Sequence, residues 1–188
     1  MNPYLRHIPN AITIARMLSL IPLVWLMLQK HYTGALILAL LAGASDGVDG
    51  FLAKRYSWQG RLGSILDPLA DKLMMLCCFS VFVYQQHFPM WLFLMIVGRD
   101  VVIILGTSYV NFFVGRLKIA TPTLVSKINT ALQIILILTL LVTLAGIYDL
   151  AEINQLLIVL VAFFTVISGI HYVWMGVRIK QQFKQGSS

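Results

Sequence analysis

Four aspartates lie within one 26-residue stretch of a chain that otherwise contains little acid. They are Asp46, Asp49, Asp67 and Asp71, out of only seven Asp and Glu residues in the whole sequence. Apolar runs flank this stretch on both sides, and carboxylates next to lipid are costly and usually functional. Four carboxylates together repel one another unless a cation lies between them. Because aspartate oxygens suit Mg²⁺, Mn²⁺ or Ca²⁺ rather than zinc or copper, the pattern predicts a site for two divalent cations.

The spacing of the aspartates indicates how they are held. Asp46 and Asp49 are three residues apart, and Asp67 and Asp71 are four apart. On a helix, both spacings place the two carboxylates on one face. We therefore expect the first pair near the end of one helix and the second pair near the start of the next, with all four directed into one pocket. Helix capping could explain Asp46 or Asp67, but it does not explain the other two.

The elements that carry these residues are predicted to be membrane helices. Hydrophobic residues make up 59% of the chain and charged residues 11%, which is far more apolar than a soluble domain. We expect an all-α membrane protein with a single domain over residues 1–185, and we read residues 186–188 as a cloning remnant. Runs of about 20 apolar residues, enough to cross the hydrocarbon core, predict six transmembrane helices over residues 11–29, 33–54, 64–86, 89–114, 123–147 and 153–177.

The basic residues predict the orientation of these helices. An even number of spans places both termini on one side. Lys and Arg residues in the termini and in the second and fourth connections outnumber those on the other side by nine to one. Basic segments stay in the cytoplasm, so both termini and the aspartates are expected to face it. The chain has a net charge of +7. Its basic residues are scattered, however, and form no patch that could bind nucleic acid.

Two classes of function fit an acidic cluster in a membrane protein. One is an enzyme that uses metal ions to handle phosphates, and the other is a divalent cation transporter. A transporter is expected to place its carboxylates near mid-membrane, in broken helices and in repeated halves. Here the cluster borders a loop rich in Lys, Arg and Gly, and the second half of the chain contains no copy of it. This comparison favours the enzyme.

The cluster also resembles a known motif. The pattern D-x2-D-G-x2-A-R-x8-G-x3-D-x3-D marks the CDP-alcohol phosphotransferases, and this chain matches it at Asp46, Asp49, Gly50, Ala53, Gly63, Asp67 and Asp71. Lys54 stands where the family has Arg, which keeps the charge but loses the planar fork. Ile8–Arg16 and Leu66–Lys72 resemble bacterial phosphatidylglycerophosphate synthases and cardiolipin synthases. Gly98–Gly106 and Pro122–Gln133 resemble the eukaryotic type of cardiolipin synthase.

This resemblance implies a six-helix homodimer whose cavity faces the cytoplasm, in a bacterial inner membrane. The implied reaction transfers a phosphatidyl group from CDP-diacylglycerol to an alcohol, and CMP leaves. The resemblance also implies that two Mg²⁺ or Mn²⁺ ions are bound by Asp46, Asp49, Asp67 and Asp71. Asp71 would in addition deprotonate the acceptor hydroxyl. The binding site for the CDP moiety would be lined by Gly50, Ala53, Lys54 and Gly63.

The acceptor alcohol is predicted from the count of cations. Glycerol-3-phosphate enzymes of this family carry A-R-E in the fourth span, a second Arg about nine residues further on, and G-K-x-K-T in the fifth span. This chain has Arg99, but Tyr109, ten residues further on, is neutral, and Asn129 replaces the second Lys. Each charged hydrogen bond contributes roughly 1.5–3 kcal/mol to the binding of a phosphate. A pocket with two fewer cations therefore suits phosphatidylglycerol better than a phosphate dianion. We therefore expect cardiolipin synthesis, with phosphatidylglycerophosphate synthesis as the alternative.

Three basic residues are candidates for contacts to the acceptor or to a lipid phosphate. They are Arg16, Arg99 and Lys127. The competing interpretation for the last two is structural. Arg99 is adjacent to Asp100 and could pair with it, and Lys127 opens a span near the cytoplasmic face, where long basic side chains commonly extend to the interface.

Overall fold

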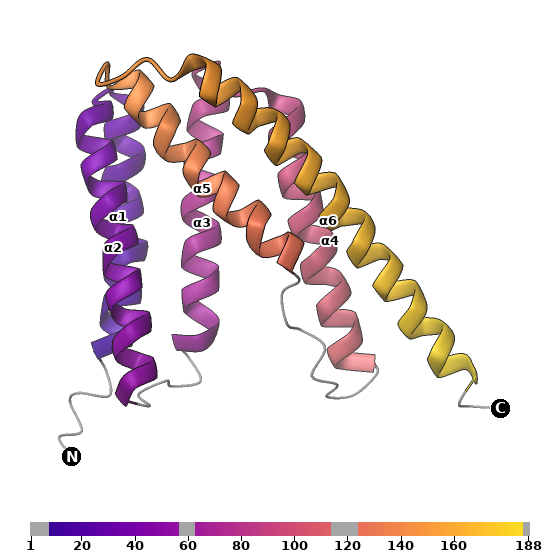
Figure 1. Cartoon of the computed structure of the whole chain (residues 1–188). Coiled ribbons are helices and arrows are strands. Elements are labelled where there is room, and N and C mark those ends of the chain that lie inside the picture. Colours follow the sequence, from indigo (N-terminus) through magenta and orange to yellow (C-terminus); the bar gives the residue numbers. More distant parts are fainter. Residues whose placement is uncertain (1–7, 57–62, 114–123, 186–188) are drawn as a thin grey trace. The chain divides into compact units, whose positions relative to one another are not determined.

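The computed structural model describes residues 8–56, 63–113 and 124–185, and the side chains of residues 14–45, 70–106, 124–172 and Trp174. Within these ranges the chain forms six α-helices and no strand (Figure 1). They are α1 (Ile8–Leu28), α2 (Tyr32–Tyr56), α3 (Gly63–Tyr84), α4 (Met90–Phe113), α5 (Leu124–Leu144) and α6 (Ala151–Gln185). The all-α prediction is confirmed. The side of the membrane on which the termini lie stays a prediction, because the helices alone do not identify the cytoplasmic side.

The helices follow the predicted runs to within three residues, except at the end of α6. This helix begins at Ala151 rather than at 153 because Asp149 Oδ1 accepts a hydrogen bond from the Ala151 amide at 3.1 Å, as an N-terminal cap does. It continues to Gln185 rather than ending at 177, because no Pro interrupts it and Lys, Arg and Gln are good helix formers. Its 35 residues span about 52 Å.

Two helices in the described part are long and apolar enough to cross a membrane by length and composition: α5, and α6 over Ala151–Tyr172. Shorter apolar stretches occupy Ile14–Leu28 and Tyr32–Ser45. Each of the six helices also exposes large apolar side chains, for example Leu18, Leu41, Leu73, Leu94, Ile135 and Ile170. Extensive exposed apolar surface is characteristic of proteins that contact lipid or partners. The number of spans, predicted as six, stays a prediction.

The chain folds into two compact units. The first comprises Met1–His87 and Ile137–Ala151, and the second comprises Phe88–Leu136 and Glu152–Ser188. The first unit thus contains α1, α2, α3 and the second part of α5, whereas the second contains α4, the first part of α5 and α6. In the first unit, α1 packs against both α2 and α3. Its fully buried apolar side chains include Leu23, Met27, Ala35, Phe79 and Phe82.

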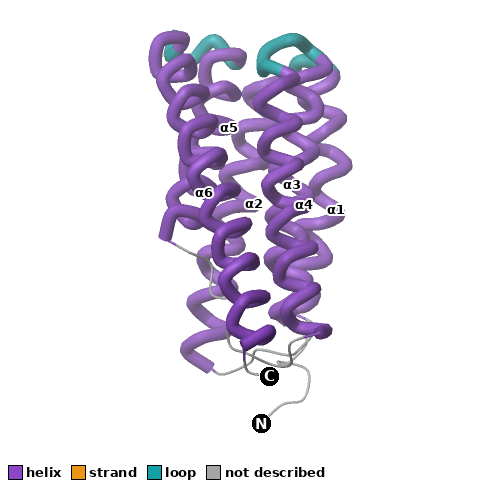
Figure 2. Tube along the Cα trace, turned by 90° about the vertical axis from the view of Figure 1, so that its right-hand side faces the viewer, coloured by secondary structure: helices purple, strands orange, loops and turns teal. Residues whose placement is uncertain are grey.

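Three helices of the first unit end in the same way. Within the described residues, a positive φ occurs at Lys30 (60°), Gln86 (62°) and Gly146 (68°), each two positions after the last residue of α1, α3 or α5. In each case the next residue donates its amide to the carbonyl five positions back, at 2.9, 2.8 and 3.2 Å. This is the Schellman motif, which satisfies the last carbonyls of a helix and reverses the chain within a few residues. The three connections lie at one end of the helices (Figure 2).

A glutamine fastens this end of the first unit. Gln85 follows α3, and its Nε2 donates to the Met27 carbonyl of α1 at 2.8 Å. Its Oε1 accepts a hydrogen bond from the Tyr32 hydroxyl of α2 at 3.1 Å. One side chain therefore joins the ends of α1, α2 and α3. The predicted aspartate site lies toward the opposite end of α2 and α3.

Candidate functional site

The predicted aspartates lie on two helices of the first unit. Asp46 and Asp49 are in the last turns of α2, and Asp67 and Asp71 are in the first turns of α3. Since both segments are continuous helix, each pair shares one helix face, as the spacing predicts. Of the four side chains, the structure describes that of Asp71. Those of Asp46, Asp49 and Asp67, and the CDP-site candidates Gly50, Ala53, Lys54 and Gly63, lie outside the described side chains, so their convergence stays a prediction.

Asp71 is held by an arginine of α1. Arg16 Nη1 donates to Asp71 Oδ1 at 3.2 Å, and the two residues are 55 positions apart in the chain. The Arg16 side chain is 3% exposed, whereas that of Asp71 is 45% exposed. The guanidinium is therefore buried against α3, while the carboxylate remains accessible from outside the helices. The structure thus gives Arg16, a candidate for contact with a lipid phosphate, an ion pair within the first unit.

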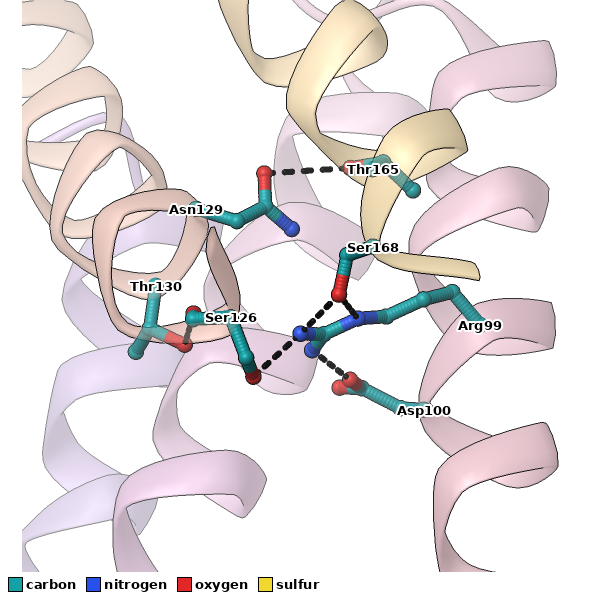
Figure 3. A network of polar contacts seen from close by, with 7 residues as sticks. All are labelled: Arg99, Asp100, Ser126, Asn129, Thr130, Thr165 and Ser168. Carbon is teal, nitrogen blue, oxygen red and sulfur yellow. Dashed lines mark hydrogen bonds and ion pairs between the residues drawn. The ribbon is translucent and has the colours of Figure 1, made fainter. Parts of the chain in front are cut away.

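A second buried arginine organises the second unit (Figure 3). Arg99 of α4 donates through Nη1 to Asp100 Oδ1 at 2.7 Å. Its Nε and Nη2 donate to Ser168 Oγ of α6 at 3.1 and 2.8 Å, and Nη2 also donates to Ser126 Oγ of α5. Arg99 therefore joins all three helices. The pairing with Asp100, expected as the structural interpretation, is confirmed, and the described network carries no net charge.

Polar side chains on one face of α5 extend this network. Asn129 is fully buried, and its Oδ1 accepts a hydrogen bond from Thr165 Oγ1 of α6 at 3.2 Å. Asn129 Nδ2 and Gln133 Nε2 are buried without a hydrogen-bond partner among the described residues. Buried amide donors normally have a partner, so each of these two donors lacks the acceptor oxygen that it would usually have. Lys127, the other α5 candidate, is exposed.

An apolar groove of about 610 Å³ lies against Arg99 in the second unit. Its volume falls within the range of roughly 300–1,000 Å³ that is typical of small-molecule pockets. The groove is formed by α4 and α6, and its lining residues are Met95, Arg99, Thr165, Val166, Gly169, Ile170 and Trp174. Arg99 and Thr165 belong to both the groove and the polar network, so the polar network borders the apolar groove.

Several of these contacts could not be predicted from the sequence. Ser126 and Ser168 each accept hydrogen bonds from Arg99, but serine is common in helices of all kinds. The Arg16–Asp71 pair was also not predicted. A signal for it exists, because an arginine within an apolar helix requires a partner of opposite charge and the sequence offers few acids. The sequence does not show which acid is the partner, because that depends on how α1 packs on α3.

The chain matches a known family over most of its length. The family model for CDP-alcohol phosphatidyltransferase matches residues 6–167. Human cardiolipin synthase (CMP-forming) is 33% identical over 204 aligned residues, which cover 97% of this chain and 65% of the human protein. A cardiolipin synthase (CMP-forming)/mitochondrial hydrolase fusion protein of Schizosaccharomyces pombe is 33% identical over 150 residues, covering 72% of this chain and 25% of the fusion protein. The chain thus spans 65% or less of these two relatives.

The alignment with a bacterial relative, named for a glycerol-3-phosphate reaction, covers more of that relative's length. The CDP-diacylglycerol–glycerol-3-phosphate 3-phosphatidyltransferase of Bacillus subtilis is 29% identical over 184 residues, which cover 88% of this chain and 93% of that protein. Both specificities therefore occur among the relatives at similar identity.

The first prediction concerns the Arg99 network. Ser168→Ala removes the oxygen that accepts two hydrogen bonds from Arg99, so we expect it to lower the free energy of unfolding by about 1.5–3 kcal/mol. The measurement is SDS-induced unfolding in mixed micelles. Ser80→Ala is the matched control, because Ser80 Oγ bonds only a backbone carbonyl of its own helix on an exposed face, and we expect a change below about 0.5 kcal/mol. Equal stability of the two variants would contradict the role of Ser168.

Proposed function

Because the chain belongs to the CDP-alcohol phosphatidyltransferase family, we propose that it transfers the phosphatidyl group of CDP-diacylglycerol to phosphatidylglycerol, forming cardiolipin and CMP. The observation that carries the choice of acceptor is the charge balance around Arg99. The Arg99 guanidinium is paired with Asp100, and the neutral Asn129 lies nearby in place of a second lysine. Such a network offers hydrogen bonds but little net positive charge, which suits a phosphodiester and a neutral glycerol better than a dianion.

The second candidate is phosphatidylglycerophosphate synthesis from glycerol-3-phosphate. It is favoured by the near full-length match to the Bacillus subtilis enzyme and by a similar match to the Aquifex aeolicus enzyme, 28% identical over 80% of this chain. The relatives described above are named as transferases or cardiolipin synthases, which favours an enzyme over a divalent cation transporter.

Two divalent cations, Mg²⁺ or Mn²⁺, are part of this proposal. Four carboxylates on α2 and α3 form a hard oxygen donor set that suits these ions, and the described carboxylate, Asp71, is accessible at 45% exposure. Asp46, Asp49, Asp67 and Asp71 would hold the ions. Bound there, the cations would neutralise the pyrophosphate and stabilise the leaving CMP.

The protein residues supply binding and proton transfer. Gly50, Ala53, Lys54 and Gly63 would line the CDP site, where small residues allow close approach. Asp71 would accept the proton of the acceptor hydroxyl as the hydroxyl oxygen bonds to the phosphatidyl phosphorus and the bond to CMP breaks. Arg99, with Lys127 nearer the surface, would contact the acceptor or a lipid phosphate. We further propose that the protein acts as a homodimer in a bacterial inner membrane, with its active site facing the cytoplasm.

The second prediction concerns the metal ions. EDTA should abolish transfer, and Mg²⁺ or Mn²⁺ should restore it. Asp46→Asn, Asp49→Asn and Asp67→Asn should each lower turnover on the order of 100-fold or more, since each replaces a charged carboxylate ligand by a neutral amide. Release of labelled CMP from purified protein in detergent gives the rate. Asp149→Asn is the control, because this carboxylate caps α6 at the opposite end of the helices. Full activity in EDTA would exclude the metal site.

The third prediction concerns Asp71 as the base. Asp71→Asn should bind CDP-diacylglycerol with near-normal affinity yet lose most of its transfer activity, because an amide cannot accept the proton. Equilibrium binding of labelled donor and single-turnover transfer are measured on the same preparation. Normal transfer by this variant would exclude the assignment.

The fourth prediction concerns the acceptor. With matched accessible concentrations in one detergent, phosphatidylglycerol should be converted to cardiolipin faster than glycerol-3-phosphate is converted to phosphatidylglycerophosphate. Asn129→Lys should shift this ratio toward glycerol-3-phosphate by adding a cation beside Arg99. Ala131→Lys, which places the same charge on an exposed position of α5, should leave the ratio unchanged. Faster turnover of glycerol-3-phosphate by the unmodified protein would establish the second candidate.

A further inference from the structure

The ion pair between Arg16 and Asp71 is markedly asymmetric. The Arg16 side chain is 3% exposed and that of Asp71 is 45% exposed, with 3.2 Å between Nη1 and Oδ1. The arginine comes from α1, which contributes none of the aspartates of the motif. One oxygen of Asp71 is therefore tied to a neighbouring helix, while the carboxylate as a whole still faces outward.

Burial makes this contact more than a surface salt bridge. Exposed ion pairs contribute little because both partners remain solvated and mobile. A buried guanidinium is desolvated, so an opposite charge beside it offsets part of the hydration that it has lost. Arg16 thus holds Asp71 more strongly than a flexible surface residue could, and it restricts the rotamers available to the Asp71 side chain.

The same burial argues against direct contact of Arg16 with a lipid. A phosphate would have to reach a guanidinium that is almost fully covered and that already donates to Asp71. Such a contact would also compete with the ion pair. The geometry favours an arginine that acts through the carboxylate it holds.

We propose that Arg16 is a positioning residue, which fixes the carboxylate of Asp71 in the orientation that this residue needs for metal binding and for accepting the proton. This proposal rests on the proposed function of Asp71. It assigns to α1 a part in the active site that the aspartate motif, confined to α2 and α3, does not contain. Residues that orient metal ligands through hydrogen bonds typically change metal affinity or activity by about 10–100-fold when they are replaced.

The experiment compares Arg16→Gln and Arg16→Lys with the unmodified protein. For each, kcat and the KM for CDP-diacylglycerol are measured, and Mn²⁺ binding is titrated by electron paramagnetic resonance without acceptor. We expect Arg16→Gln to weaken Mn²⁺ binding and to lower kcat, each by about 10–100-fold, with little change in KM. Arg16→Lys keeps the charge without the planar fork, so its Mn²⁺ affinity and kcat should lie between those of Arg16→Gln and the unmodified protein.

A neighbouring serine provides the matched control. Ser19 lies one turn from Arg16 on α1, and its Oγ donates to the Arg16 carbonyl at 2.7 Å without touching the ion pair. Ser19→Ala should leave Mn²⁺ affinity, kcat and KM unchanged. If Arg16→Gln does not accumulate as folded protein, Arg16→Lys alone still decides the question, because weaker Mn²⁺ binding with unchanged KM is expected for it too.

Three outcomes would overturn the proposal. A raised KM for CDP-diacylglycerol with normal kcat and Mn²⁺ affinity would make Arg16 a lipid contact. Equal losses in Arg16→Gln and Arg16→Lys, accompanied by a lower melting temperature, would make its role purely structural. Absence of Mn²⁺ binding by the unmodified protein would remove the site itself. If instead Arg16→Gln weakens Mn²⁺ binding but the unmodified protein transfers no phosphatidyl group, the positioning role stands and the proposed reaction fails.

Discussion

The structure depends on one constraint, which is that a guanidinium cannot be buried among apolar helices without partners. The desolvation of a single charge costs several kcal/mol unless hydrogen bonds and an opposite charge compensate for it. Two arginines in the described part meet this constraint in different ways. Arg99 is surrounded by one carboxylate and two serine hydroxyls, whereas Arg16 is paired across helices with Asp71. In both cases the requirement for partners determines which helix faces meet.

These two solutions give the two units different characters. The network of Arg99 is balanced within itself, so it offers a ligand hydrogen-bonding groups rather than charge, and it opens onto an apolar groove between α4 and α6. The pair formed by Arg16 instead leaves a carboxylate exposed on the helix that carries the second half of the aspartate motif. The described polar groups of the second unit are thus balanced in charge, whereas the first unit presents an accessible carboxylate.

Much of the fold could be predicted from the sequence, because long apolar runs specify helices almost directly. The ends were less certain: α6 starts earlier than predicted because Asp149 caps it. The pairing of Arg99 with Asp100 was foreseen because the two are adjacent. Its serine partners were not, because serine gives no signal, and the Arg16–Asp71 contact depends on packing between positions 55 residues apart. The aspartate motif itself was apparent from composition and spacing alone.

Gln85 joins α1, α2 and α3 at one end of the first unit, so a tilt of α3 would turn about that end. Asp71 lies 14 residues before Gln85 in the chain, which along a helix is a lever arm of about 21 Å. A tilt of α3 by only about 3° about this end displaces Asp71 by about 1 Å. Displacements of that size can change a reaction rate on the order of 100-fold. Arg16 joins α1 to α3 at the position of Asp71, so the packing of α1 against α3 bears on the position of this carboxylate where a tilt of α3 would displace it most.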